Sequence, residues 1–209
     1  MQKRKKLLVM TQFSILLAIE VIVCFTPLGS LPAIGPVVAT LSHLPVIITA
    51  ILLGTKAGAG MGFFFGLFSF IVWTFMPPAP IAFVFTPFYS LGEIHGSIWS
   101  IMICFIPRVL IGVITGITYK WFSGKTKNRV ILYGISAVLG SLTNTILVLA
   151  GIYFIFGQSY AVATGSSYQL LKAVFAMTIL TNGIPEAAIG GIISYGICRP
   201  MEYVNRLDT

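Results

Sequence analysis

Six mostly apolar stretches, each about long enough to cross a membrane as a helix, follow one another along this chain. A hydrocarbon layer of about 30 Å needs roughly 20 helical residues, and within it backbone groups must find partners inside the protein. Of the 209 residues, 57% are hydrophobic and 9% are charged, which leaves too few polar groups to cover a water-soluble protein. The sequence therefore predicts an all-α integral membrane protein, a six-transmembrane-helix bundle in a single membrane domain.

The predicted helices cover about residues 7–25, 37–54, 58–75, 97–119, 130–156 and 168–198. The first follows four basic residues, as a secretory signal would, but Glu20 interrupts it and no small-residue cleavage site precedes Pro27. We therefore expect a retained first helix. The connections 26–36 and 81–96 are apolar and rich in Pro, Gly or aromatic residues. We expect them to fold back over the bundle, with partial immersion in the membrane interface as the alternative.

Basic residues mark one side of the predicted bundle. An even number of helices places both termini on one side, and cytoplasmic segments of membrane proteins carry an excess of Lys and Arg. We therefore predict a multi-pass protein of the cell membrane with cytoplasmic termini. Orientation in the membrane also explains the net charge of +8, so we expect no nucleic-acid partner. Only Lys172 lies near the other side; the residues on the terminal side are Lys3, Arg4, Lys5, Lys6, Lys56, Lys120, Lys125, Lys127, Arg129, Arg199 and Arg206.

Three ionisable residues, Glu20, Arg108 and Glu186, interrupt the apolar stretches at similar depth. At about 1.5 Å per residue each lies roughly 18–21 Å from the basic end of its helix. A charge at such depth is costly and needs polar partners. Pro107 lacks an N–H and so frees a carbonyl close to Arg108. The three residues predict a buried polar centre, either a structural ion pair or a site for a proton or a ligand charge.

Further polar and aromatic side chains predict a substrate pocket. Trp73, Tyr89, His95, Asn144 and Lys172 fall at middle or outer levels and would place hydrogen-bonding groups on apolar walls. Trp73 also suits an interfacial belt, and Lys172 suits a side chain that reaches the headgroups. The run from Asn182 to Pro185 predicts a local opening of the sixth helix, which would line a binding site or form a packed kink.

Small residues at four-residue spacing predict close helix contacts. Gly54, Gly58, Gly62 and Gly66 form one such series, and Gly112 and Gly116 form another. We expect both to serve packing within the bundle. Ser14 and Ala18, on the first helix, form a weaker pair that would suit docking of a partner's helix.

Signatures of catalysis and of metal binding are missing from the sequence. It contains no nucleophile elbow, no His-Glu-x-x-His and no phosphate loop. Cys24, Cys104 and Cys198 have no metal-ligand spacing and suit plain buried positions. We expect no enzyme, no metal site and no cofactor bound by this chain, so that any ATP would be hydrolysed by partner subunits.

Several motifs together resemble the S components of energy-coupling-factor (ECF) vitamin transporters, in the branch that includes riboflavin and pantothenate members. The resemblance covers nearly the whole chain. It rests on the basic N-terminus, Ser42-His43-Leu44-Pro45-Val46-Ile47, Leu53-Gly54-x-Lys56-Ala57-Gly58, Gly66-Leu67-Phe68-Ser69, and Pro107-Arg108-x-Leu110-x-Gly112.

The resemblance implies a six-helix subunit in the membrane lipid that captures a water-soluble vitamin at its outward side. It would join a transmembrane coupling (T) protein and two cytoplasmic ATPases. Family members contact the coupling protein through Ala-x-x-x-Ala on the first helix, where this chain has Ser14 and Ala18. Segments two to four look most like pantothenate members, and an anionic substrate would suit Lys172. Riboflavin, stacked on Trp73 or Tyr89, is the alternative.

Two other functions remain open from the sequence. One is a stand-alone proton-coupled small-molecule carrier, in which Glu20 or Glu186 would titrate. The other is an intramembrane enzyme or a lipid-modifying protein. The first would transport without partner subunits, and this property separates it from an ECF-type importer.

Overall fold

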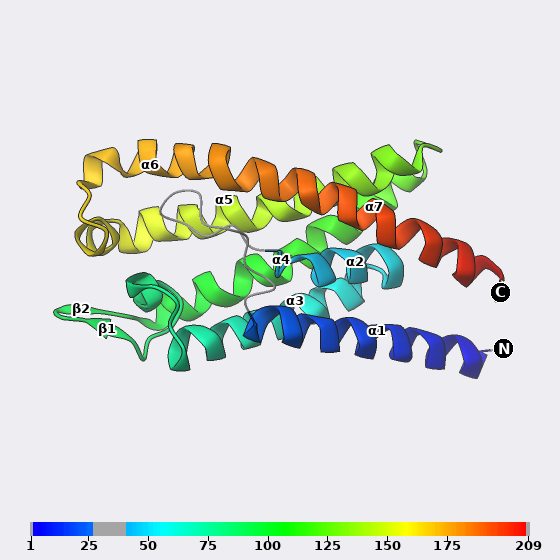
Figure 1. The fold of residues 1–209 in the computed structure, drawn as a ribbon, viewed down its shortest axis with the longest axis horizontal. Helices are drawn as coiled ribbons and strands as arrows, with labels where there is room; N and C mark the ends of the chain where they lie inside the picture. Colours follow the sequence, from blue (N-terminus) through cyan, green and yellow to red (C-terminus); the bar gives the residue numbers. More distant parts are fainter. Residues whose placement is uncertain (1, 27–40, 208–209) are drawn as a thin grey trace.

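The computed structural model describes residues 2–26 and 41–207, and these form an elongated helical bundle (Figure 1). Both termini lie at one end of the bundle, and a short β-hairpin lies at the other. The α-helices are α1 (Gln2–Phe25), α2 (Leu44–Leu53), α3 (Thr55–Phe75), α4 (Ile98–Ser123), α5 (Arg129–Ala163), α6 (Leu171–Thr178) and α7 (Ile184–Leu207). Shorter elements are the 3-10 helices η2 (Pro80–Val84) and η3 (Tyr168–Leu170), the π-helical turn η4 (Ile179–Gly183), and strands β1 (Ser90–Leu91) and β2 (Ile94–His95).

Five helices in the described part of the chain are long and apolar enough to cross a membrane. They span Lys6–Phe25, Thr55–Phe75, Ile98–Ser123, Arg129–Ala163 and Tyr168–Glu202, the last including η3, α6, η4 and α7 as far as Glu202. The second predicted span differs, because α2 has 10 residues and begins only at Leu44. Residues 37–40 of that prediction, and the connection 26–36 beyond Thr26, lie outside the described residues. The helical membrane fold is thus confirmed, with α2 shorter than predicted.

Close packing of α3 on α4 follows the predicted glycine spacing. A Cβ on Gly58 would lie 3.1 Å from the carbonyl oxygen of Gly112, and one on Gly66 would lie 3.0 Å from the ring of Phe105. Because bare backbone faces bare backbone at Gly58 and Gly112, the two helices approach more closely there than larger side chains would allow. Gly54 ends α2 with φ of +93°, a conformation that glycine adopts without strain. The prediction of internal packing is confirmed for Gly58, Gly62, Gly66, Gly112 and Gly116, whereas a Cβ on Gly54 would meet no atom within 4 Å.

The first part of the connection between α3 and α4 folds back into the bundle, as predicted, whereas the hairpin of β1 and β2 projects from the end of the bundle (Figure 1). Ala82, Phe83 and Val84 of η2 are fully buried, and the hydroxyl of Ser100, at the start of α4, donates to the carbonyl of Phe83 at 2.6 Å. This buried segment belongs to a hydrophobic cluster with residues of α4, α5 and α6. A second cluster, nearer the termini, joins α1, α2, α3, α4, α5 and α7.

The last two helical segments depart from their predicted limits. The predicted fifth helix ends at residue 156, yet α5 continues to Ala163. Gly157 lies in this continuation and is covered by the ring of Tyr168, since a Cβ added at Gly157 would lie 2.5 Å from that ring. The predicted opening before Pro185 is wrong, because the chain stays helical through η4. The N–H of Ile184 there donates to the carbonyl of Ile179, five residues earlier.

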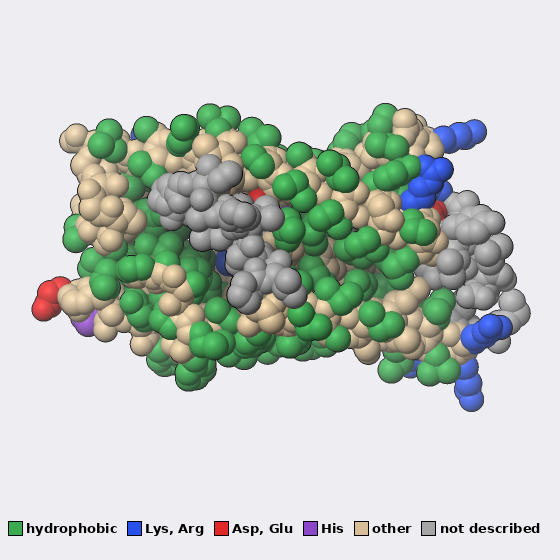
Figure 2. Space-filling model, viewed as in Figure 1, with side chains coloured by type: hydrophobic (Ala, Val, Ile, Leu, Met, Phe, Trp, Pro, Cys, Tyr) green, Lys and Arg blue, Asp and Glu red, His purple; other side chains and the backbone are tan. Residues whose placement is uncertain are grey.

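Charged side chains separate along the bundle. Figure 2 shows Lys and Arg side chains gathered at the end that carries both termini, and acidic and histidine side chains at the opposite tip. Arg129 and Glu202 form an ion pair of 2.9 Å at the terminal end. The middle of the molecule is mostly apolar at its surface, as contact with lipid requires.

Candidate functional site

A cavity of about 590 Å³ lies among α1, α3, α4, α5, η4 and α7. In the middle of Figure 2, a few blue and red atoms are visible beside the grey atoms, where the surface is otherwise green and tan. The apolar part of the wall comes mainly from α3, α5 and the connection between Met76 and Phe85. Its side chains with a polar atom are Cys24, Thr26, Ser42, Ser69, Trp73, Arg108, Asn144, Thr145, Tyr160, Thr178, Asn182 and Glu186.

Arg108 occupies the α4 wall of this cavity. The N–H missing from Pro107 would have bonded to the carbonyl of Ile103, four residues earlier, and the Nη1 of Arg108 donates to that carbonyl at 3.0 Å. The guanidinium also lies over the rings of Phe65 and Phe85, at 5.6 and 5.1 Å from their centroids. The proline therefore supplies the acceptor that holds the arginine, and two aromatic rings support its charge.

The acidic residues lie close to the cavity without pairing with Arg108. Glu186 is 9% exposed and lines the cavity from the first turn of α7. Glu20 is fully buried, and its carboxylate accepts a hydrogen bond from the thiol of Cys24 at 3.3 Å. Among the described residues, no ion pair joins Arg108 to either glutamate. The ion pair considered as one interpretation of these residues is therefore not found.

Two asparagines face the cavity from α5 and from the π-helical turn. Asn144 is half-buried, and its Oδ1 has no hydrogen-bond donor among the described residues. Asn182 is buried and lies next to Gly183, which also lines the cavity. Because the π turn inserts an extra residue, it changes the helix face presented here. Thr178, Asn182 and Glu186, spaced four residues apart, all reach the cavity.

Trp73 provides an aromatic wall near the hairpin end. Its ring lies 4.6 Å from that of Phe85, with an interplanar angle of 30°. Phe85 is buried and also contacts the guanidinium of Arg108. Phe85 therefore contacts Trp73 on one side and the guanidinium of Arg108 on the other, along the same wall.

Three of the predicted pocket residues lie away from this cavity. Tyr89 packs against the hydrophobic cluster beside η2, and His95 is exposed in β2, paired with Ser90 of β1. Lys172 is exposed on α6, with its Nζ 5.8 Å from the ring centroid of Tyr153. The structure therefore brings together Trp73, Arg108, Asn144, Asn182 and Glu186, and leaves these three outside.

Several cavity residues were not identified from the sequence. Ser69 and Phe65 precede Trp73 by one and two helical turns, and Thr178 precedes Asn182 by one. Residues four apart share a helix face, so counting back from the predicted residues would have found them. Tyr160 lies beyond the predicted end of its helix and carried no comparable signal.

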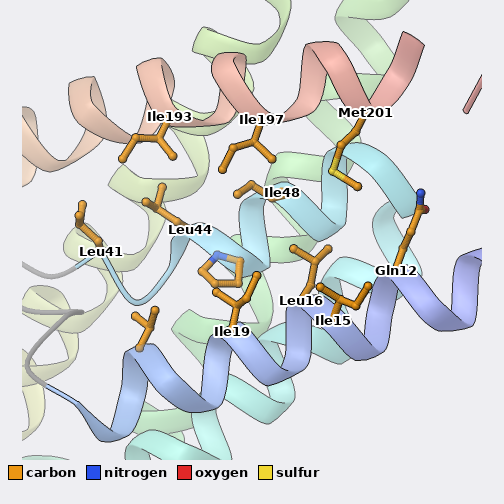
Figure 3. Close-up of a pocket in the computed structure, with 12 residues that line it drawn as sticks. Gln12, Ile15, Leu16, Ile19, Leu41, Leu44, Ile48, Ile193, Ile197 and Met201 are labelled. Atoms are coloured by element: carbon orange, nitrogen blue, oxygen red, sulfur yellow. The ribbon is translucent and has the colours of Figure 1, made fainter. Parts of the chain in front are cut away.

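A second, smaller pocket of about 320 Å³ lies between α1, α2 and α7. Figure 3 shows Ile15, Leu16 and Ile19 of α1 facing Ile193 and Ile197 of α7, with Leu44 and Ile48 of α2 between them. The amide of Gln12 is the polar side chain among its described lining residues. The larger cavity, which carries charged and amide groups, is therefore the candidate site for a polar solute.

The predicted docking pair lies on the outer face of α1. Ser14 and Ala18 are both exposed, as are Ile15 and Ile22 on the same helix. A flat strip of small residues beside larger apolar ones is thus available to the membrane or to a partner helix.

Comparisons with known proteins agree with this architecture. A crystal structure of the S component for biotin from an ECF-type ABC transporter matches 97% of this chain and 95% of its own length, with a TM-score of 0.57 and 16% identity. At this identity the likeness concerns the fold alone.

Two relatives are similar in sequence. The pantothenic acid transporter PanT of Lactococcus lactis subsp. cremoris is 39% identical over 163 residues, which cover 78% of this chain and 76% of the relative. The pantothenate transporter PanT of Leuconostoc mesenteroides subsp. mesenteroides is 32% identical over 210 residues, which cover 91% of this chain and 93% of the relative.

The family model described as "ECF transporter, substrate-specific component" matches residues 8–198. This match confirms the resemblance found in the sequence, and it confirms the prediction that the protein is not an enzyme. The chain belongs to the family of substrate-specific components of ECF transporters.

Proposed function

We propose that this protein captures pantothenate at the outer face of the cell membrane, as the substrate-binding subunit of an ATP-driven importer. The observation that carries the proposal is the cavity of about 590 Å³ with a buried cation and amide groups on apolar walls. Its size lies within the range of about 300–1,000 Å³ that is usual for small-ligand sites. Similarity to two proteins named as pantothenate transporters supports the choice of vitamin.

The charge distribution supports an outward-facing cavity. The cavity is lined by the C-terminal ends of α1 and α3, away from the basic end that carries both termini. If the basic end is cytoplasmic, as the excess of Lys and Arg indicates, the cavity lies toward the outer side. A vitamin would then enter the cavity from outside and be held between the helices. The protein would bind the vitamin without altering it chemically.

Partner subunits would supply the energy. In this proposal a transmembrane coupling (T) protein docks on the membrane-facing surface, and two cytoplasmic ATPases hydrolyse ATP, with no cofactor bound by this chain. The exposed strip with Ser14 and Ala18 on α1 is the candidate contact with the T protein.

One experiment tests the function directly. Purified protein should bind radiolabelled pantothenate, and liposomes containing it alone should not take the vitamin up. Uptake should begin only when the coupling protein, the ATPases and internal ATP are added. Uptake by the lone chain, driven by a pH gradient, would instead favour the stand-alone carrier, and tighter binding of riboflavin than of pantothenate would change the vitamin.

A further inference from the structure

The smaller pocket between α1, α2 and α7 is an apolar groove that is open to the surroundings (Figure 3). Leu16 and Ile48 line it and are buried, whereas Ile15 and Ile19 line it and are exposed. Both α1 and α7 pack against α2, which lies between them along the groove. The lining residues of α1 and α7 belong to two helices that are apolar enough to cross a membrane. The groove therefore opens toward hydrocarbon.

This groove has the length of one membrane leaflet and the width of one hydrocarbon chain. From Gln12 to Val23 on α1 the helical rise gives about 16 Å, and half of a hydrocarbon layer of about 30 Å is about 15 Å. A volume of about 320 Å³ spread over that length corresponds to a channel about 5 Å across. Apolar carbons pack about 4 Å apart, so one alkyl chain fits. A helix, which is about 10–12 Å across with its side chains, does not.

The end of the groove nearest the termini is basic. Gln12 and Met201 lie at this end (Figure 3), and Figure 2 shows Lys and Arg side chains gathered at the same end of the bundle. Arg4 is exposed and precedes Gln12 by eight residues. Because residues four apart share a helix face, Arg4 and Leu8 continue the groove-lining face of α1. Positive charge thus lies where the headgroup of a lipid in the groove would reach the membrane surface.

We propose that this groove binds one acyl chain of an anionic phospholipid, with the headgroup beside Arg4. The chain would fill a hollow in which the buried side chains of Leu16 and Ile48 otherwise lack apolar neighbours on one side. A zwitterionic lipid could place a chain there but would gain less from the cation. This lipid site is separate from the vitamin cavity, with which it shares only Val23 among the described lining residues.

The test measures which lipid the purified full chain retains in native mass spectrometry. The protein is equilibrated in detergent with equal amounts of dioleoyl phosphatidylglycerol, which is anionic, and dioleoyl phosphatidylcholine, which is zwitterionic. The wild-type protein should retain phosphatidylglycerol in preference. Ile19→Trp, which places a larger ring in the groove, should lose this lipid. Val21→Trp is the matched control and should keep it, because Val21 lies on the same helix with 39% exposure against 42% for Ile19 and does not line the groove.

A second pair of variants tests the headgroup. Because one cation near a membrane surface attracts anionic lipid, Arg4→Gln should lower the preference for phosphatidylglycerol over phosphatidylcholine by about fivefold. Lys3→Gln removes the neighbouring charge, which lies about 100° away around α1. This control should keep the wild-type preference. Equal effects of the two variants would overturn the contact with Arg4.

Other outcomes would remove the lipid site itself. Equal retention of the two lipids by the wild-type protein would do so, and so would equal lipid retention by Ile19→Trp and Val21→Trp. If Ile19→Trp keeps its lipid but no longer co-purifies with the coupling protein, the groove is a protein contact instead. The comparison of two lipids on the wild-type protein needs no variant, so misfolding of Ile19→Trp would not prevent a decision.

Discussion

Gly62 of α3 lies directly against the backbone of Arg108 in α4. A Cβ at position 62 would overlap the carbonyl oxygen of Arg108 and would lie 2.9 Å from the Cα of Val109. The lack of a side chain at Gly62 therefore allows the contact between α3 and α4. It also allows the position of Arg108 in the wall of the cavity. Any group larger than hydrogen at this position must push α4, and the guanidinium with it, away from α3.

Gly62→Ala should lower both the stability of the protein and its affinity for pantothenate. Overpacking of this kind costs about 1–3 kcal/mol, and the shift of α4 would displace Arg108. Gly60→Ala is the control on the same helix, because a Cβ there meets no atom within 4 Å. Thermal unfolding in detergent and calorimetric titration measure the two effects. Equal behaviour of the two variants would contradict the close contact.

Intrinsic fluorescence should report binding through one tryptophan. Of the three tryptophans in the sequence, Trp73 lines the cavity, whereas Trp99 and Trp121 are 52% and 56% exposed. Pantothenate should therefore change the emission of the wild-type protein, and Trp73→Phe should lose this change. Trp99→Phe and Trp121→Phe should keep it. An emission change that persists in Trp73→Phe would mean that the ligand binds elsewhere.

Asn144→Ala should weaken pantothenate binding by roughly 5- to 150-fold, since an unmade hydrogen bond to a buried group costs about 1–3 kcal/mol. Thr143→Ala, at the neighbouring position of α5, is the control, because Thr143 does not line the cavity. Its hydroxyl donates to the carbonyl of Leu139 at 2.6 Å. Radioligand binding should separate the two variants, and similar losses in both would point to a general effect on α5.

Ser14→Trp should prevent assembly with the coupling protein while leaving vitamin binding intact. Its bulk would interrupt the strip of small residues on α1. Ile192→Trp places the same ring on α7, at a position that is 73% exposed, and should allow assembly. Co-purification with the coupling protein and the ATPases is the measurement. Recovery of a full complex with Ser14→Trp would remove this face of α1 from the proposed interface.

The terminal end of the bundle should be stabilised by one shared carboxylate. Tyr133 donates a hydrogen bond to Glu202, and Arg129 pairs with the same side chain at 2.9 Å. A double-mutant cycle of Tyr133→Phe and Glu202→Gln should give a coupling of about 0.5–1.5 kcal/mol in unfolding free energy. Pantothenate affinity should not change, because neither residue lines the cavity. Additive losses of stability would contradict the shared contact.

The parts of this fold that were predictable from the sequence are those governed by simple periodicity. Long apolar runs gave the five long helices, and glycine spacing gave the contact between α3 and α4. Pro107 indicated a free carbonyl, and the structure shows Arg108 bound to it. These features depend on residues close together in sequence or on one helix face.

Features that depend on contacts between distant segments were not predictable in the same way. Gly157 and Pro185 usually interrupt helices, yet the ring of Tyr168 covers the first and a π turn accommodates the second. For the cavity, the depth of a residue along its helix correctly indicated Trp73 and Asn144 as lining residues. The same criterion also indicated Tyr89 and Lys172, which do not line the cavity. Depth alone does not give the rotation of a helix about its axis.

The π turn at Ile179–Gly183 makes the cavity sensitive to chain length as well as to residue identity. A π turn accommodates one residue more than a regular α-helical turn does, so deleting a single residue here would restore regular winding and change which side chains the turn itself presents to the cavity. Relatives with one residue fewer here would present a different set of side chains to the same space, and transporters built on one scaffold would in this way acquire different cargo.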